Sequence, residues 1–343
     1  MSQLLTPRTL IFRTVAALVL LAAVMFVCLL IGSEKVSLSA AFTGSGSQTT
    51  SNPDYEILVR FRLPRIVLAC LVGAALACSG VVFQALLRNP LADPYILGIS
   101  SGAGLGAIIA VISGLNWTLW GRSPIAVFAF IGALGTVWFV WFLGRLTGRF
   151  YVTGLLLAGV VVNAFFSAMI MFLTSVSKAE QVYSTILWLM GNMTEADFFV
   201  LWIGTGCVVG GVAALYFISP QLNALSFGPE AAKSMGVNTG RTRTIAFAIA
   251  AGITAIAVSL SGLVGFVGLV VPHGVRLVFG PDHRQLLPLS AIVGAIFLVL
   301  ADTLARTIVA PTQLPVGVVT AIVGGPFFLV LLVRYSRKVS WLR

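Results

Sequence analysis

Long apolar runs, separated by charged residues or by clusters of glycine and proline, follow one another along almost the whole chain. A helix that spans the hydrocarbon core of a bilayer needs about 20 consecutive, mostly apolar residues. Runs that approach or reach this length predict ten spanning helices, at residues 15–31, 66–86, 96–112, 125–143, 155–173, 198–218, 245–260, 263–277, 286–304 and 316–333. The eighth run is short and contains Gly265, Gly268 and Pro272, so nine spans would also fit the pattern.

The pattern and the composition agree on the class of protein. Apolar and polar positions do not alternate along the runs, as the strands of a membrane barrel would require. Of the 343 residues, 59% are hydrophobic and only 9% are charged, which leaves too few charges to cover a soluble domain. No low-complexity linker divides the chain. The sequence therefore predicts an all-α polytopic membrane protein with one transmembrane domain over residues 1–343.

The basic residues predict the orientation of this domain. The formal net charge is +11, but the Lys and Arg residues are scattered between the apolar runs, which argues against a nucleic-acid partner. If the N-terminus is cytoplasmic, most of them fall on the cytoplasmic side, as the positive-inside rule requires. Both termini are then cytoplasmic. The segment RFRLPR at residues 60–65 is an exception, because its three arginines face outward.

A polar segment at residues 219–244 forms the largest predicted cytoplasmic connection. Within it, Glu230, Ala231 and Ala232 begin a short predicted helix that Gly236 ends as a C-terminal cap. A short helix held between two spans suits docking into another protein, whereas a plain connector would need no helix. The segment approaches a phosphate-binding loop, but Ala232 stands where that motif needs glycine. We therefore expect no ATP site in this chain.

The stretch ALLRNPLADPYILGISSGAG at residues 85–104 places polar residues, prolines and glycines between two apolar runs. Pro90 and Pro94 stop helix formation, because proline lacks the backbone donor and restricts the preceding residue. Irregular backbone at membrane depth is tolerated only where protein covers it or where it lines a cavity. Glycines on the following run predict a smooth face for close helix packing; they are Gly98, Gly102, Gly104 and Gly106. The stretch either borders such a cavity or serves only as a structural hinge between two helices.

At this point the sequence resembles the membrane subunits of type II ATP-binding cassette importers, which take up iron-siderophores, haem and cobalamin. The similarity rests on five motifs in the family's order: RLPR at 62–65, NPLADPYILGISSGAG at 89–104, GLVGFVGLVVPH at 262–273, DHRQLLP at 282–288 and LPVGVVTAIVGGP at 314–326. The resemblance implies a ten-helix subunit of the bacterial inner membrane that pairs with a second copy of itself. It also implies two cytoplasmic ATPase subunits, which hold ATP and Mg, and a periplasmic substrate-binding protein.

The resemblance assigns a cytoplasmic gate to two segments. Asn89 and Leu91, in the Asn-Pro-Leu turn, are expected to constrict the pathway. The second constriction in the family is a run of small hydroxyl residues, which corresponds here to Tyr151, Val152 and Thr153. Only Thr153 keeps the hydroxyl pattern, whereas Tyr151 and Val152 depart from it. The gate is expected at Val152 and Thr153.

Other residues on and between the spans have two possible roles each. Asn163 and Ser167 lie four residues apart on one helix face and either line the pathway or bond to a neighbouring helix. The resemblance implies that Arg62 and Arg306 pair with carboxylates of the binding protein, since a guanidinium can grip a carboxylate at two points. The alternatives are snorkelling to lipid headgroups and, for Arg306, a partner in its own helix at Asp302.

An ion-coupled secondary transporter is the rival function. Such proteins commonly carry an acidic residue at the bilayer midplane, whereas Asp93, Glu195 and Asp302 all fall near the ends of predicted spans. Catalysis is not expected, since His273 and His283 have no carboxylate at a useful spacing. The four cysteines lie within apolar runs without metal-ligand spacing, so no metal site is expected either. The sequence thus favours a permease subunit driven by separate ATPases, and leaves siderophore, haem and cobalamin open as cargo.

Overall fold

The computed structural model describes residues 6–34, 36–37, 41, 52–115, 123–146, 151–193 and 198–340. Over this part of the chain every regular element is a helix, which confirms the all-α prediction. Among the described residues, seven helices are long and apolar enough to cross a membrane, and three further apolar helices occupy the remaining runs. The ten helices are α1 Pro7–Leu30, α4 Leu63–Leu86, α5 Ile99–Ile112, α6 Pro124–Leu146, α7 Tyr151–Ser175, α9 Phe198–Phe217, α12 Thr239–Ser261, α13 Val267–Phe279, α14 His283–Thr307 and α15 Val316–Ser340.

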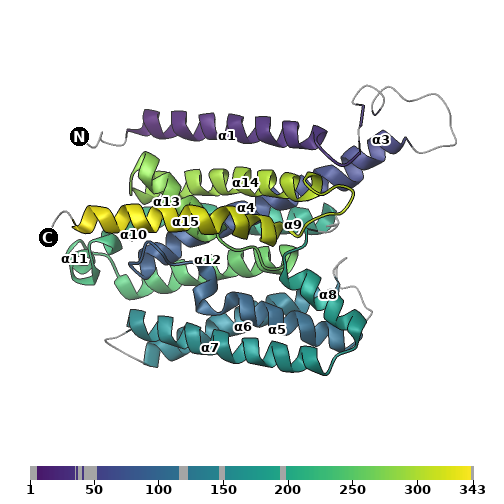
Figure 1. Ribbon diagram of the computed structural model, residues 1–343. Helices are drawn as coiled ribbons and strands as arrows, with labels where there is room; N and C mark the ends of the chain where they lie inside the picture. Colours follow the sequence, from purple (N-terminus) through teal and green to yellow (C-terminus); the bar gives the residue numbers. More distant parts are fainter. Residues whose placement is uncertain are drawn as a thin grey trace.

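Short helices join the spans at both ends of the bundle. They are α3 Pro53–Tyr55, η1 Glu56–Arg62, η2 Pro94–Leu97, α8 Ala179–Leu189, α10 Ser219–Ser226 and α11 Pro229–Ser234. Figure 1 shows the two marked chain ends at the same end of the bundle as α10 and α11, while α3 and α8 lie at the opposite end. This arrangement agrees with an even number of crossings and with both termini in the cytoplasm.

Helix α4 is the centre of the packing. It contacts α14, α12 and α13 along its length, whereas α1 and α7 form opposite edges of the bundle (Figure 1). Glycines allow these central backbones to approach closely: a methyl group at Gly73 would meet the carbonyl of Gly294, and one at Gly80 would meet that of Gly268. In hydrocarbon, where apolar burial gives no driving force between helices, such close packing is a main source of association.

The glycines of α5 serve two neighbours instead of one. Gly102 and Gly106 face α6, where an added methyl would meet the backbone of Gly132 and Phe128 respectively. Gly104 points away from α6, toward side chains of α7 and α8. The expectation of one smooth face was therefore wrong in detail, because residues two apart lie on opposite sides of a helix.

Two spans are broken inside the membrane. Helix α5 has 14 residues and α13 has 13, so each is about 20 Å long and shorter than a hydrocarbon core of about 30 Å. The irregular segments that complete them, 87–98 and 262–266, meet at Tyr95. Its hydroxyl donates to the Val264 carbonyl at 2.9 Å and accepts from the Val264 amide at 3.0 Å. The shortness of the eighth run is thus a real break, and Tyr95 supplies the hydrogen bonds that the break leaves open.

Replacing Tyr95 with Phe should lower the thermal stability of the purified protein in detergent. The change removes one partner from both polar groups of the Val264 backbone and keeps the ring, and leaving such buried groups without partners costs about 1–3 kcal/mol each. Tyr183→Phe on α8 is the matched control, because the Tyr183 side chain is exposed. Equal unfolding temperatures for the two variants and the parent protein would show that Tyr95 does not hold this junction.

Candidate functional site

The turn after α4 is held by the side chain and the backbone of Asn89. The Asn89 carbonyl Oδ1 accepts a hydrogen bond from the Leu91 amide at 2.9 Å, and the Asn89 backbone carbonyl accepts from Ala92 at 3.1 Å. Arg88, before them, has a left-handed backbone with φ of 49°, which is uncommon outside glycine. Leu91 is exposed and Asn89 is half-buried. The turn therefore presents Leu91 outward from a fixed backbone.

The second predicted gate segment lies at the start of α7. Val152 is half-buried and packs against the core, while Thr153 is exposed. The element that follows Leu91, η2, contacts α7 two turns farther along, where a methyl group added to Gly159 would touch the backbone at Ile96. Within one chain the two predicted gate segments are therefore linked through η2 and α7.

Asn163 and Ser167 lie on a face of α7 that the chain leaves largely open. Ser167 is exposed and Asn163 is half-buried. Val160 and Met171, which share this face by helical spacing, are both exposed. The face is thus mainly apolar, with two polar groups along it.

The outer end holds a cluster of Arg62, Arg65, Arg306 and Asp302, here called the outer arginine cluster. Arg62 is buried, and its guanidinium donates to the carbonyls of Leu29 at 3.0 Å, Leu30 at 3.1 Å and Glu34 at 2.5 Å. The last carbonyls of a helix have no partner within the helix. Arg62 therefore ties the end of α1 to the start of α4.

Asp302 binds the other two arginines of this cluster. Its carboxylate is only 1% exposed and accepts from Arg65 Nε at 3.0 Å, while Arg306 Nε lies 3.2 Å from it. The alternative partner for Arg306 within its own helix is therefore the one that this structure shows. Both Arg62 and Arg306 point inward here, and their docking to a binding protein stays a prediction.

The predicted cytoplasmic helix is present as α11. Gly236, at φ of 81°, donates to the Lys233 carbonyl at 2.8 Å, and Val237 donates to that of Ala232 at 3.0 Å. This is the Schellman arrangement that ends a helix at a left-handed glycine. Glu230 is exposed and pairs with Lys233 at 3.3 Å, Ala231 is half-buried, and Ala232 is fully buried.

Two large apolar side chains beside α11 were not predicted from the sequence as functional residues. Phe227, before the helix, and Met235, at its end, are both exposed on the cytoplasmic side. The sequence does contain a signal for Phe227, because an aromatic residue directly before Gly-Pro in a polar cytoplasmic loop cannot be explained by contact with lipid. Exposed apolar groups flanking a capped helix are typical of an interaction surface.

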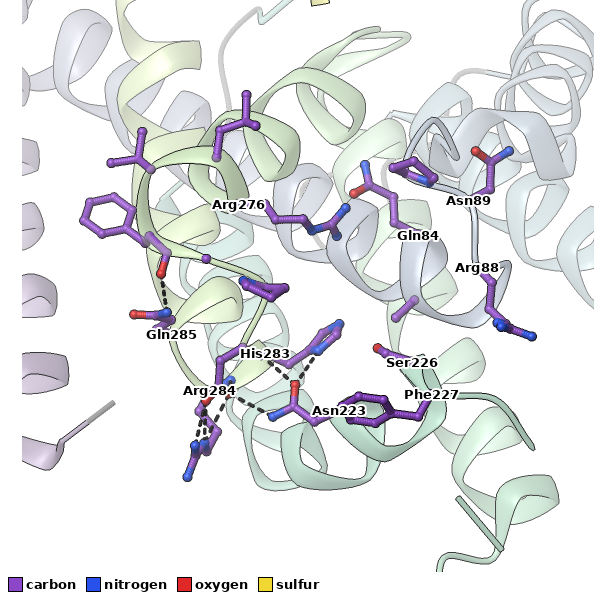
Figure 2. A pocket seen from close by; sticks show the side chains of 18 of the residues that line it. Gln84, Arg88, Asn89, Asn223, Ser226, Phe227, Arg276, His283, Arg284 and Gln285 are labelled. Carbon is purple, nitrogen blue, oxygen red and sulfur yellow. Dashed lines mark hydrogen bonds and ion pairs between the residues drawn. The ribbon is translucent and has the colours of Figure 1, made fainter. Parts of the chain in front are cut away.

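A cavity of about 1070 Å³ opens at the same end, between the end of α4, helix α10 and the α13–α14 turn (Figure 2). Asn223 organises one wall: its Nδ2 donates to Asp282 at 2.8 Å, and its Oδ1 lies 2.7 Å from His283 Nδ1. Burial raises the pKa of Asp282, but hydrogen bonds from Arg284 and Asn223 outweigh it and lower the pKa to about 2. Asp282 is therefore ionised at neutral pH, and its charge is paired with Arg284 at 2.6 Å.

Known proteins resemble this chain over almost its full length. The FecCD transport family matches residues 20–334. The hemin transport system permease protein HmuU of Yersinia pestis is 41% identical over 92% of this chain and 95% of its own. The cobalamin import system permease protein BtuC of Halobacterium salinarum is 44% identical over 80% of this chain and 73% of its own.

A solved structure shares the fold. It is described as an inward-facing conformation of a putative metal-chelate type ABC transporter, with a TM-score of 0.82 and 31% identity, and the match covers 96% of this chain and all of that one. The sequence match, the shared fold and the ten apolar helices lead to one assignment. The chain belongs to the FecCD transport family and is a multi-pass permease of the type II ATP-binding cassette importers of the inner membrane.

Proposed function

We propose that this chain imports an iron chelate, haem or cobalamin from the periplasm by alternating access between two copies of itself. The observation that carries the proposal is the family match over residues 20–334, together with relatives named for hemin and cobalamin. The energy is proposed to come from two separate ATPase subunits that bind ATP and Mg, and the cargo from a periplasmic binding protein.

The open face of α7 is the proposed wall of the pathway. Its mainly apolar surface, with Asn163 and Ser167 as isolated polar groups, suits a bulky chelate that must slide without strong binding. Asn89, Leu91, Val152 and Thr153 are proposed to close its cytoplasmic end. The link from the Asn89 turn through η2 to α7 supports this assignment, because movement of α7 would be transmitted to both gate segments.

The rival, an ion-coupled transporter, would use an acidic residue at the midplane. Asp302 is held by Arg65 and Arg306, and Asp93 caps η2 by accepting from the Tyr95 amide at 2.8 Å. Glu195 lies outside the described residues. Both described carboxylates therefore already have a structural role, Asp302 in an ion-pair cluster and Asp93 in a helix cap.

Reconstitution in liposomes separates the two functions. The chain, assembled with its ATPase and binding protein, should take up labelled ferric siderophore, haem or cobalamin only when hydrolysable ATP is on the ATPase side. Uptake by the chain alone, driven by a proton or sodium gradient, would establish the rival function instead. Assaying the three cargo classes in parallel identifies the substrate.

The α11 surface is the proposed coupling site, with Glu230, Ala231, Ala232 and Gly236 forming the helix that enters the ATPase. Phe227→Asp and Met235→Asp should weaken co-purification with the ATPase by about tenfold or more, as expected for exposed apolar anchors of an interface. Asn238→Asp is the control, since it adds the same charge nearby and can keep its cap on the Arg241 amide. Full assembly and ATP-coupled uptake in both Asp variants would place the ATPase elsewhere.

The gate prediction can be tested by cross-linking between copies. Leu91→Cys, in a background where the exposed Cys207 is replaced by Ser, should form a disulfide across the dimer when the cytoplasmic side is closed. The yield should fall in the nucleotide state that opens this side. A yield that is the same in every nucleotide state would leave the Asn89 turn with a structural role only.

Docking of the binding protein is proposed at the outer arginine cluster, where Arg62 and Arg306 would exchange their internal partners for carboxylates. Arg62→Glu should then cost about 2 kcal/mol of binding free energy, with an effect that shrinks at high salt because exposed charges are screened over about 8 Å. A Glu→Arg change on the binding protein should restore part of the affinity.

Arg60→Glu is the matched control, because Arg60 lies two residues away and is well exposed. If Arg62 and Arg306 serve only as internal ties, their Glu variants will lower the unfolding temperature and leave the affinity for the binding protein unchanged at every salt concentration. That result would refute docking through these two residues.

A further inference from the structure

The cytoplasmic cavity contains a buried acceptor on His283. This side chain is only 4% exposed. Its Nδ1 faces the Asn223 carbonyl oxygen at 2.7 Å, and that amide is oriented by donating its Nδ2 to the Asp282 carboxylate. Because Asn223 Oδ1 can only accept, His283 Nδ1 carries the proton and Nε2 of the neutral ring is an acceptor. No described residue forms a hydrogen bond with Nε2.

Gln84 supplies a second acceptor on the opposite wall. It is 3% exposed, and its Nε2 lies 3.5 Å from the carbonyls of Gly268 and Leu269. This contact turns the Oε1 atom away from those carbonyls, and within the described part of the chain Oε1 has no hydrogen-bond partner. Buried acceptors of this kind are rare in proteins and call for a donor.

Two guanidinium groups provide donors without an acceptor. Figure 2 shows Arg276 and Gln84 reaching into the cavity from α13 and α4, with Arg88 at its edge. In the described residues the side chains of Arg276 and Arg88 form no hydrogen bond or ion pair with another side chain. The only carboxylate in the wall belongs to Asp282, which Arg284 already neutralises. The cavity therefore combines excess positive charge with two unused acceptors.

One side of the cavity is apolar. Leu277 and Val278, on the last turn of α13, line it and are exposed. Arg13 of α1 closes the neighbouring side, with its guanidinium over the Phe279 ring and a 2.8 Å hydrogen bond to Gln285. Basic pockets between helix ends, beside apolar surface on the cytoplasmic side, are typical sites for lipid headgroups.

We propose that this cavity binds a phosphate group that carries hydroxyl donors. The phosphate oxygens accept from Arg276 and Arg88, and the hydroxyls donate to Gln84 Oε1 and His283 Nε2. A carboxylate alone would leave the two acceptors unsatisfied, whereas a glycerol phosphate supplies both kinds of group. The exposed apolar turn of α13 favours the glycerol phosphate headgroup of an inner-leaflet lipid over a free phosphate ester. This proposal does not depend on which cargo the importer carries.

Native mass spectrometry of the purified full chain, after delipidation, tests the proposal. The probes are phosphatidylglycerol, phosphatidylethanolamine, glycerol 3-phosphate and inorganic phosphate, each titrated against the same preparation. We expect phosphatidylglycerol to bind best, and Arg276→Gln to weaken it by roughly tenfold to a hundredfold, as for loss of a charged hydrogen bond. Gln84→Met, which keeps the length of the side chain but removes its amide and with it the Oε1 acceptor, should reduce the preference for phosphatidylglycerol over phosphatidylethanolamine.

Arg241→Gln is the matched control, because Arg241 is an exposed arginine at the same end of the helix bundle and does not line the cavity. If glycerol 3-phosphate binds as well as the lipid and Arg276→Gln weakens both, the site holds with a free phosphate ester as its ligand. Equal binding of all probes by the parent chain, Arg276→Gln and Arg241→Gln would overturn the proposal. The proposal would also be overturned if the parent chain bound none of the probes and Arg276→Gln lost assembly with the ATPase. That result would assign the cavity to a carboxylate of the ATPase.

Discussion

Every backbone amide and carbonyl inside the hydrocarbon must find a partner within the protein, because no water is present to supply one. Unbroken helices meet this requirement by themselves, but α5 and α13 begin inside the membrane and do not. The Tyr95 hydroxyl provides a partner for both the carbonyl and the amide of Val264. At the start of α15, the Gly191 carbonyl accepts a hydrogen bond from the Val316 amide at 3.1 Å. The irregular segments are thereby fixed to one another, so the bundle has a rigid centre at the depth where its helices break.

Close glycine contacts extend this rigidity outward along α4. Gly73 and Gly80 bring the backbone of α4 against α14 and the start of α13, so these helices are expected to move as one body. Helix α7 has a different environment, since one of its long faces is exposed and its remaining contacts run chiefly to α6, α5 and η2. The alternating access proposed for this protein would use such a division, because packed interfaces switch between arrangements and do not deform continuously.

The apolar pattern was sufficient to predict the ten helices, and Gly236 with its neighbours was sufficient to predict α11 and its cap. Both depend on residues close together in the sequence. The orientation of Arg62 could not be predicted, because its partners at Leu29 and Leu30 lie more than 30 residues away. The contact of Asn223 with His283 joins positions 60 residues apart, and only the folded structure shows that the histidine has a partner.

Arginines at the two ends of the molecule have opposite surroundings, and this difference carries more functional information than their number. At the outer end, Arg62 is satisfied by carbonyls and Arg65 and Arg306 share Asp302. At the inner end, Asp282 pairs with Arg284, and the described structure offers no carboxylate to Arg276 or Arg88. Arg276 is half-buried, and a half-buried charge without a partner is costly, so we expect a ligand to supply the missing charge. The positive-inside rule explains why arginines lie at the cytoplasmic end. It does not explain why one of them lies in a cavity beside two unsatisfied acceptors. An anionic ligand with hydroxyl groups would explain both the unpaired arginine and the unsatisfied acceptors.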